Sequence, residues 1–158
     1  MIIKEKSELE HLQKISDIVA LTLLEMKKYT KVGMSTKEID DFGGKILAKH
    51  GATSAPKSVY DFPGYTCICV NEEIAHGIPS SEKIIKDGDL INIDVSAEMD
   101  GFYSDNGGSF IVGKDIYNKQ PDKDYIWKGF RELKVVAKEV MNYPTLKRFL
   151  ISFFLLSI

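Results

Sequence analysis

The Asp100-Gly101 pair constrains the fold most, because it is a strong hairpin signal between two strand-like runs. The run before it, residues 90–95, is Leu-Ile-Asn-Ile-Asp-Val, and the chain returns through residues 102–105 to an apolar run at 109–112. If Asp100 and Gly101 are the two central residues of a tight turn, the flanking strands pair antiparallel. The sequence therefore predicts an antiparallel sheet in the middle of the chain.

Two amphipathic helices are predicted before this sheet. Ser7 to Glu10 matches a capping box, and Ser35 to Glu38 opens a second helix that Gly51 ends. The inward-facing residues expected from the helical spacing are Leu9, Leu12, Ile15, Val19, Leu23 and Met26 in the first helix, and Ile39, Phe42, Ile46 and Leu47 in the second. Helices that precede a sheet in this way predict an α+β fold, in which the helices cover the sheet.

The segment between Gly51 and the sheet is predicted to be a loop, because Pro56, Pro63 and Gly64 break helices. A strand is expected to follow it at residues 65–70.

Composition restricts the type of domain, its binding partners and its cellular location. The chain has 158 residues, 44% of them hydrophobic, which suits a globular domain, and its net charge of −2 disfavours direct nucleic acid binding. Two cysteines, Cys67 and Cys69, cannot form a disulfide framework, which favours a reducing, cytoplasmic location. Residues 1–15 lack the apolar core of a secretory signal, and the apolar run 149–158 is about half of what a membrane span requires.

Asp94 interrupts an apolar strand, where a buried carboxylate without a partner is costly. A tight Asp-Gly turn pairs Asp105 with Ser96, diagonally across from Asp94, whereas a four-residue loop from Glu98 places the two aspartates directly opposite. Both registers put the carboxylates on one face, where divalent cations would relieve their repulsion. The alternative is that both acids lie on a solvated sheet face. His76, in the connection at residues 71–79, has a similar alternative as an ordinary surface residue.

Three segments together resemble type I methionine aminopeptidases, which are metallopeptidases with the pita-bread fold. They are Cys67 to Pro79 (CICVNEEIAHGIP), Gly88 to Val95 (GDLINIDV) and Asp100 to Asp105 (DGFYSD). The resemblance extends from the first helix to about Gly113 and implies that the chain holds the first half of this fold. It also implies an enzyme that removes the initiator methionine from nascent polypeptides, with nascent peptide N-termini at the ribosome as its expected partners.

The resemblance also implies residue roles. Asp94 and Asp105 would be two of five ligands to a centre of two divalent metal ions (cobalt, manganese, iron or zinc), with Asp105 bridging both. His76 would be the catalytic, substrate-binding histidine that donates a hydrogen bond to the substrate or to the tetrahedral intermediate. Cys67 and Phe62 would line the pocket for the methionine side chain, and ordinary strand packing is the alternative for both.

The chain departs from the family pattern in several places. The other ligands of the family, one histidine and two glutamates, lie in a second half, and no histidine follows Asp105 here. We therefore expect a truncated, inactive chain unless a second chain supplies that half. Asn106 stands where threonine is usual and Cys69 where serine is common, and either change could alter support for the site. The alternatives for function are a non-catalytic or vestigial binding fragment of the fold and a proline-specific dipeptidase relative.

The predicted organisation has three parts. Residues 1–113 form the aminopeptidase-like half, and residues 114–143 form a charged linker and a third helix. Residues 144–158 form an apolar tail that is either foreign to the fold or a buried terminal helix or strand.

Overall fold

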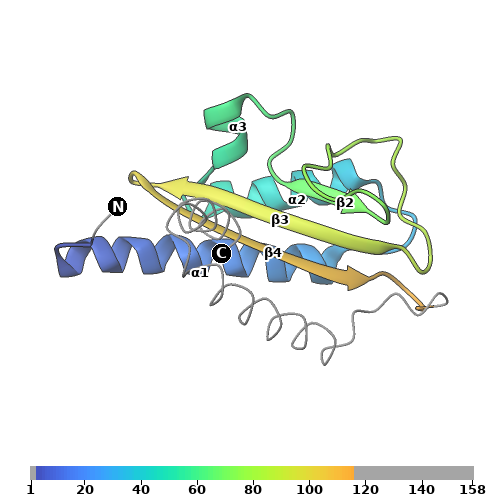
Figure 1. Ribbon diagram of the computed structural model, residues 1–158, viewed down its shortest axis with the longest axis horizontal. Helices are drawn as coiled ribbons and strands as arrows, with labels where there is room; N and C mark the ends of the chain where they lie inside the picture. Colours follow the sequence, from blue (N-terminus) through green and yellow to red (C-terminus); the bar gives the residue numbers. More distant parts are fainter. Residues whose placement is uncertain (1–2, 116–158) are drawn as a thin grey trace, which may run out of the picture. The chain divides into compact units, whose positions relative to one another are not determined.

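The computed structural model describes residues 3–115. Three helices and four strands follow in this order: α1 (Lys6–Tyr29), α2 (Thr36–Lys49), β1 (Thr53–Ser54), α3 (Ala55–Tyr60), β2 (Cys67–Val70), β3 (Leu90–Met99) and β4 (Phe102–Ile111). Figure 1 shows the long β3–β4 hairpin lying across α1 and α2. This arrangement is the predicted α+β architecture.

The four strands form one antiparallel sheet that is organised around β3. β4 pairs along the full length of β3 on one side, while β2 and the short β1 pair with successive parts of its other side. Asp100 and Gly101 connect β3 to β4 with φ angles of 56° and 82°. Two left-handed central residues define the type I′ turn, whose twist matches the flanking strands. The predicted tight turn is therefore confirmed.

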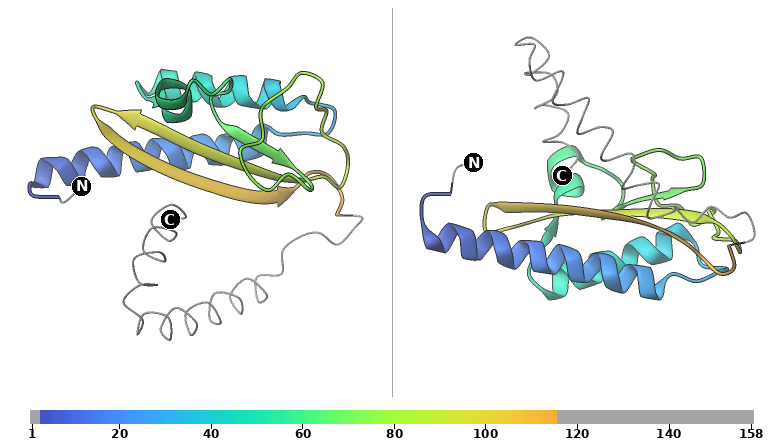
Figure 2. Two further views of the ribbon diagram at one scale, coloured as in Figure 1. Left: turned by 45° about the horizontal axis from the view of Figure 1, so that its top comes forward. Right: turned by 60° about the horizontal axis from the view of Figure 1, so that its bottom comes forward.

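Helices α1 and α2 cover one face of the sheet, as Figure 2 shows. Alternate residues of β3 are buried against them, beginning with Ile91 and Ile93, each 0% exposed. From the helices, Ile15, Ile39 and Leu47 complete the core. The predicted inward positions are thus confirmed for most of both helices. The prediction for Leu9 is wrong, because this residue lies near the start of α1 and is 40% exposed.

The start of α1 also differs from the prediction. The helix begins at Lys6 with Glu5 as its N-cap, and Glu8 accepts the N–H groups of Lys4 and Glu5 at 2.6 and 3.1 Å. Glu8 thus satisfies free N–H groups that the proposed Ser7 box would have left outside the helix. The second capping box is confirmed, since Ser35 and Glu38 bond reciprocally at the start of α2.

The expected loop between Gly51 and the sheet contains β1 and α3. Pro56 lies in the first turn of α3, where its missing N–H is not needed, and Ser54 caps the helix. The predicted strand at 65–70 is shorter, because the N–H groups of Tyr65 and Thr66 donate to the buried Asp40 carboxylate rather than to a strand. The predicted third helix and apolar tail lie outside the described residues.

Candidate metal and substrate site

The β3–β4 hairpin brings the two predicted ligands together on the sheet face that α1 and α2 leave open. Asp105 pairs with Ser96, and Asp94 pairs with Gly107, so the two aspartates are diagonal neighbours. The register of the tight turn is therefore confirmed, and direct opposition of Asp94 and Asp105 is wrong. The turn type decides this, because a two-residue loop fixes the pairing of every later residue.

The two carboxylates interact directly. Partial burial, the negative charge of Asp94 and a hydrogen bond shared with Asp94 raise the pKa of Asp105 to about 6. A proton between two close carboxyl groups relieves the repulsion that a bound cation would otherwise relieve. The pair is thus a local concentration of negative charge on an exposed face.

Cys67 of β2 lies beside this pair, because it is the cross-strand partner of Asp94. Burial, followed by the charge of Asp94, raises the pKa of the Cys67 thiol to about 11. The thiol is therefore neutral near pH 7 and behaves as a small apolar, polarizable group. Both cysteines are free thiols.

Gly107 leaves room next to Asp94. A Cβ atom at this position would lie 3.3 Å from Asp94 Oδ1, which is tighter than ordinary contact. With glycine there, the carboxylate has open space on the side that faces β4. Carboxylate oxygens are the ligands that hard divalent cations prefer.

The donors present fit part of a metal centre. In residues 3–115, no group of three or more histidine, cysteine, aspartate or glutamate side chains is placed to hold a metal ion. Asp94 and Asp105 together supply two carboxylate donors, which divalent cations prefer. They account for two of the five ligands that the resemblance implies.

His76 lies in the loop that follows β2. Its side chain is exposed, its φ is 54°, and the next residue, Gly77, is bonded back to β2. The described residues show no hydrogen bond from the His76 ring to either aspartate. Phe62 is half-buried just after α3, and its N–H donates to Pro56 O at 3.3 Å. The structure thus brings together Asp94, Asp105 and Cys67, and the roles of all five residues, His76 and Phe62 included, stay predictions.

The two departures from the family pattern lie on different faces. Asn106 pairs with Val95, whose side chain is buried on the helix-covered face, so Asn106 alternates away from the aspartates. Cys69 pairs with Asn92 and shares the face of Cys67 and Asp94. Only the cysteine is therefore placed to support the open face.

Sequence reasoning missed the contacts of two anchoring residues. Asp40 in α2 is fully buried and accepts from Tyr65 N–H, Thr66 N–H and the Thr66 hydroxyl, all between 2.8 and 3.1 Å. Burial raises the Asp40 pKa despite these donors. An aspartate in the buried stripe of an amphipathic helix was the available signal. The second anchor, Cys69, accepts from Gly77 N–H, and residue type alone did not indicate it.

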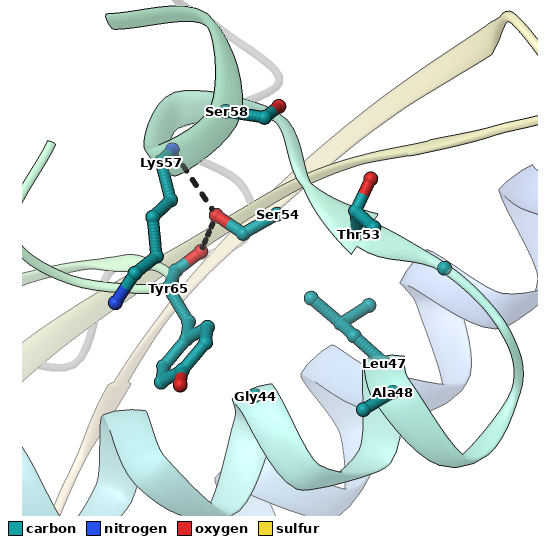
Figure 3. Close-up of a pocket in the computed structure, with 9 residues that line it drawn as sticks. Gly44, Leu47, Ala48, Thr53, Ser54, Lys57, Ser58 and Tyr65 are labelled. Atoms are coloured by element: carbon teal, nitrogen blue, oxygen red, sulfur yellow. Dashed lines mark hydrogen bonds between the residues drawn. The ribbon is translucent and has the colours of Figure 1, made fainter. Parts of the chain in front are cut away.

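A separate hollow of about 300 Å³ lies between α2, β1 and α3 (Figure 3). Leu47 and Ala48 line its apolar side, and the ammonium of Lys57 lies 4.2 Å from the centre of the Tyr65 ring. None of the predicted site residues lines it. The hollow is thus distinct from the aspartate pair.

A search of the described helices finds none that combines the length and the apolar character needed to cross a bilayer.

The curated proteins most relevant here are methionine aminopeptidases. The chain is 59% identical over 114 residues to methionine aminopeptidase 2 of Bacillus subtilis, covering 72% of this chain and 46% of that protein. It is 50% identical over 114 residues to a methionine aminopeptidase of Staphylococcus epidermidis, covering 72% and 45%. The chain thus spans about half the length of these curated relatives.

Solved structures agree on the fold. The methionine aminopeptidase of Thermotoga maritima matches with a TM-score of 0.68 and 32% identity, covering 90% of this chain and 53% of that one. That of Rickettsia prowazekii matches with a TM-score of 0.67 and 29% identity, covering 72% and 46%. The predicted assignment to the first half of the pita-bread fold is confirmed.

The sequence profile of metallopeptidase family M24 matches residues 10–138, which is most of the chain. Membership of a metallopeptidase family implies a divalent metal cofactor. Together with the aspartate pair on the open face of the sheet, this match shows that the chain belongs to metallopeptidase family M24.

Proposed function

We propose that this chain forms the Asp94/Asp105 half of a methionine aminopeptidase, which hydrolyses the peptide bond after the N-terminal methionine of nascent polypeptides. The observation that carries the proposal is the placement of both carboxylates on one open sheet face. The 59% identity to a named methionine aminopeptidase supports the choice of substrate.

Asp94 and Asp105 would supply two of the ligands to a pair of divalent metal ions. When bound, the ions supply Lewis acidity at the scissile carbonyl and make a water molecule more acidic. No side chain packs against the Asp94 carboxylate from position 107, because the residue there is glycine. The space beside this carboxylate is therefore open.

Cys67 and Phe62 would receive the methionine side chain. Cys67 is buried and neutral, so its sulfur presents a polarizable surface to a thioether without the cost of a desolvated charge. Cys67 is also the strand partner of Asp94, so a side chain against this thiol would lie next to the metal ligand. The pocket would thus orient the scissile bond toward the carboxylates.

His76 would donate a hydrogen bond to the substrate carbonyl or to the tetrahedral intermediate. A donor that is already in place when charge develops lowers the barrier more than one that must reorganise. The left-handed backbone at His76 and the anchored Gly77 are consistent with such a preset donor.

The other half of the site would come from residues outside the described range, in a longer protein or a second chain. Two carboxylates alone bind an ion weakly and do not fix two ions in the geometry that water activation requires.

The test is an aminopeptidase assay on a Met-Gly-Xaa peptide with added manganese or cobalt. We expect no turnover by the 158-residue polypeptide and chelator-sensitive turnover when it is joined to the second half of the Bacillus subtilis relative. Asp105→Asn should abolish that activity, while Asp17→Asn, an exposed aspartate of α1, should preserve it. Hydrolysis of Xaa-Pro dipeptides instead of methionyl peptides would overturn the substrate assignment.

A second assay tests His76. In the joined protein, His76→Ala should depress turnover far more than metal content, because a hydrogen-bond donor is not a ligand. Loss of metal in proportion to activity would show that His76 is a ligand instead.

A further inference from the structure

The loop that carries His76 is tied to the sheet at both ends. At its start, Asn71 N–H donates to Leu90 O at 2.8 Å, and Asn71 Oδ1 accepts from Leu90 N–H at 3.1 Å. At its end, Ile68 N–H donates to Gly77 O at 2.9 Å, and Gly77 N–H donates to Cys69 Sγ at 3.3 Å. Between these ends the loop is exposed, as the 98% exposure of Ile74 shows.

His76 adopts a backbone conformation that needs such support. Its φ of 54° lies in the left-handed region, which is unfavourable for a residue that has a side chain. A conformation of this kind persists only when its surroundings determine it. The residue that immediately follows, Gly77, carries both bonds to β2, so these bonds are the nearest restraint on His76.

Gly77 can reach β2 only because it has no side chain. A Cβ atom there would overlap Ile68 O and would lie 2.9 Å from Cys69 Cα. Because the obstructing atoms are backbone atoms of a strand, they cannot move aside cheaply. The close approach therefore brings the Gly77 N–H within reach of a thiol on a short side chain.

The Cys69 thiol lies on the same face of the sheet as the proposed substrate site. Cys69 lies two residues from Cys67, so both side chains project to the Asp94 side of β2. Cys69 is 3% exposed and Gly77 is buried, so water does not replace the bond easily. A buried N–H that loses its acceptor destabilises the conformation that buries it.

We propose that Cys69 is a positioning residue for His76, whose thiol sulfur fixes the end of the loop by accepting the Gly77 N–H. This inference rests on the proposed function, because His76 matters only if it acts on the substrate. Cys69 itself touches neither metal nor peptide in this assignment.

The experiment follows the Gly77 amide and the His76 backbone by NMR in the 158-residue chain labelled with ¹⁵N. Cys69→Ala and Cys69→Val both remove the acceptor, and valine keeps the site filled and suits a strand if alanine does not fold. We expect Gly77 hydrogen exchange to rise about fivefold to tenfold, as for the loss of one hydrogen bond. The His76 order parameter should fall from about 0.85 to below about 0.6.

Cys69→Ser provides the rescue, because its hydroxyl is again an acceptor, and both values should return toward wild type. Cys67→Ala is the matched control, since this cysteine lies on the same strand and face and shows no hydrogen bond to the loop among the described residues. It should leave Gly77 exchange unchanged. Unchanged exchange in Cys69→Ala and Cys69→Val would overturn the proposal, and so would an equal rise at the core amide of Val95.

These measurements need neither metal nor peptide, so they stand or fall separately from the aminopeptidase assignment. If the joined protein is active, Cys69→Ala should lower kcat at unchanged metal content, and Cys69→Ser should keep most of kcat. A lowered metal content in parallel with kcat would contradict a role through His76.

Discussion

The two faces of β3 are formed by alternating residues of one strand and differ in burial: one face packs in the core, and the other carries the aspartate pair. On the covered face, Ile91, Ile93 and Val95 are all 0% exposed beneath α1 and α2. On the open face, Asn92 and Asp94 are only half-buried, and their neighbours on β4 are exposed. Burial of large aliphatic side chains stabilises the hairpin. The open face is thereby free to carry two carboxylates that repel each other.

The largest effect is expected on the covered face. Ile93→Ala should lower the free energy of unfolding by about 2–5 kcal/mol, because it removes buried methyl groups and leaves a cavity. Urea denaturation measures this change. Ile74→Ala, at a residue 98% exposed, is the matched control and should change stability by less than about 0.5 kcal/mol. Equal costs at the two sites would mean that the covered face is not the core.

A buried carboxylate should behave unlike the open pair. Asp40→Ala should cost about 3 kcal/mol of unfolding free energy, since it leaves the donors of Tyr65 and Thr66 without an acceptor. The same denaturation experiment on Asp41→Asn gives the control, because Asp41 is partly exposed and only pairs with Lys37. A small effect of Asp40→Ala, similar to that of Asp41→Asn, would show that water replaces Asp40.

On the open face, substitution should affect metal binding more than stability. Asp94→Asn and Asp105→Asn should each weaken any manganese binding by at least about tenfold, because each removes one of two anionic donors. Calorimetric titration is the measurement, with Asp17→Asn as the control. Unchanged affinity in both variants would place bound metal elsewhere and leave the aspartates on a solvated face.

The smallest effect is the pH dependence of the metal-free chain. The pKa of Asp105 is raised in the folded state, so its contribution to stability is full below about pH 4 and is lost as the pH rises through about 6. We expect a loss of about 1 kcal/mol between these values, because solvent screens this exposed group. Denaturation curves across this range, compared with those of Asp105→Asn, isolate the contribution. An identical pH profile in the variant would mean that the carboxylates do not interact.

Much of this architecture could be predicted from local sequence. The Asp100-Gly101 signal predicted the hairpin, and both registers that it allowed placed Asp94 and Asp105 on one face; the structure has the register of the tight turn. Ser35 and Glu38 marked the start of α2, since capping depends on neighbouring residues alone. The family resemblance then supplied the expected roles of Asp94, Asp105, His76, Phe62 and Cys67, and all of these roles stay predictions.

The misses have two causes. Tyr65 and Thr66 have strand-like composition, yet their N–H groups bond to Asp40, 25 and 26 positions earlier in the chain, a partner that local patterns do not reveal. The helix after Ser54 and the start of α1 are local features instead: Ser54 caps α3 with Pro56 in its first turn, and Glu5 and Glu8 form the capping box of α1.

The sequence by itself determined the α+β class, the hairpin turn and the shared face of the two aspartates, because periodicity and turn chemistry act over a few residues. Only the tertiary structure decided that Asp40 holds the entry to β2 and that Cys69 holds Gly77. These contacts depend on how closely separate segments approach, and the approach is set by packing of the whole core.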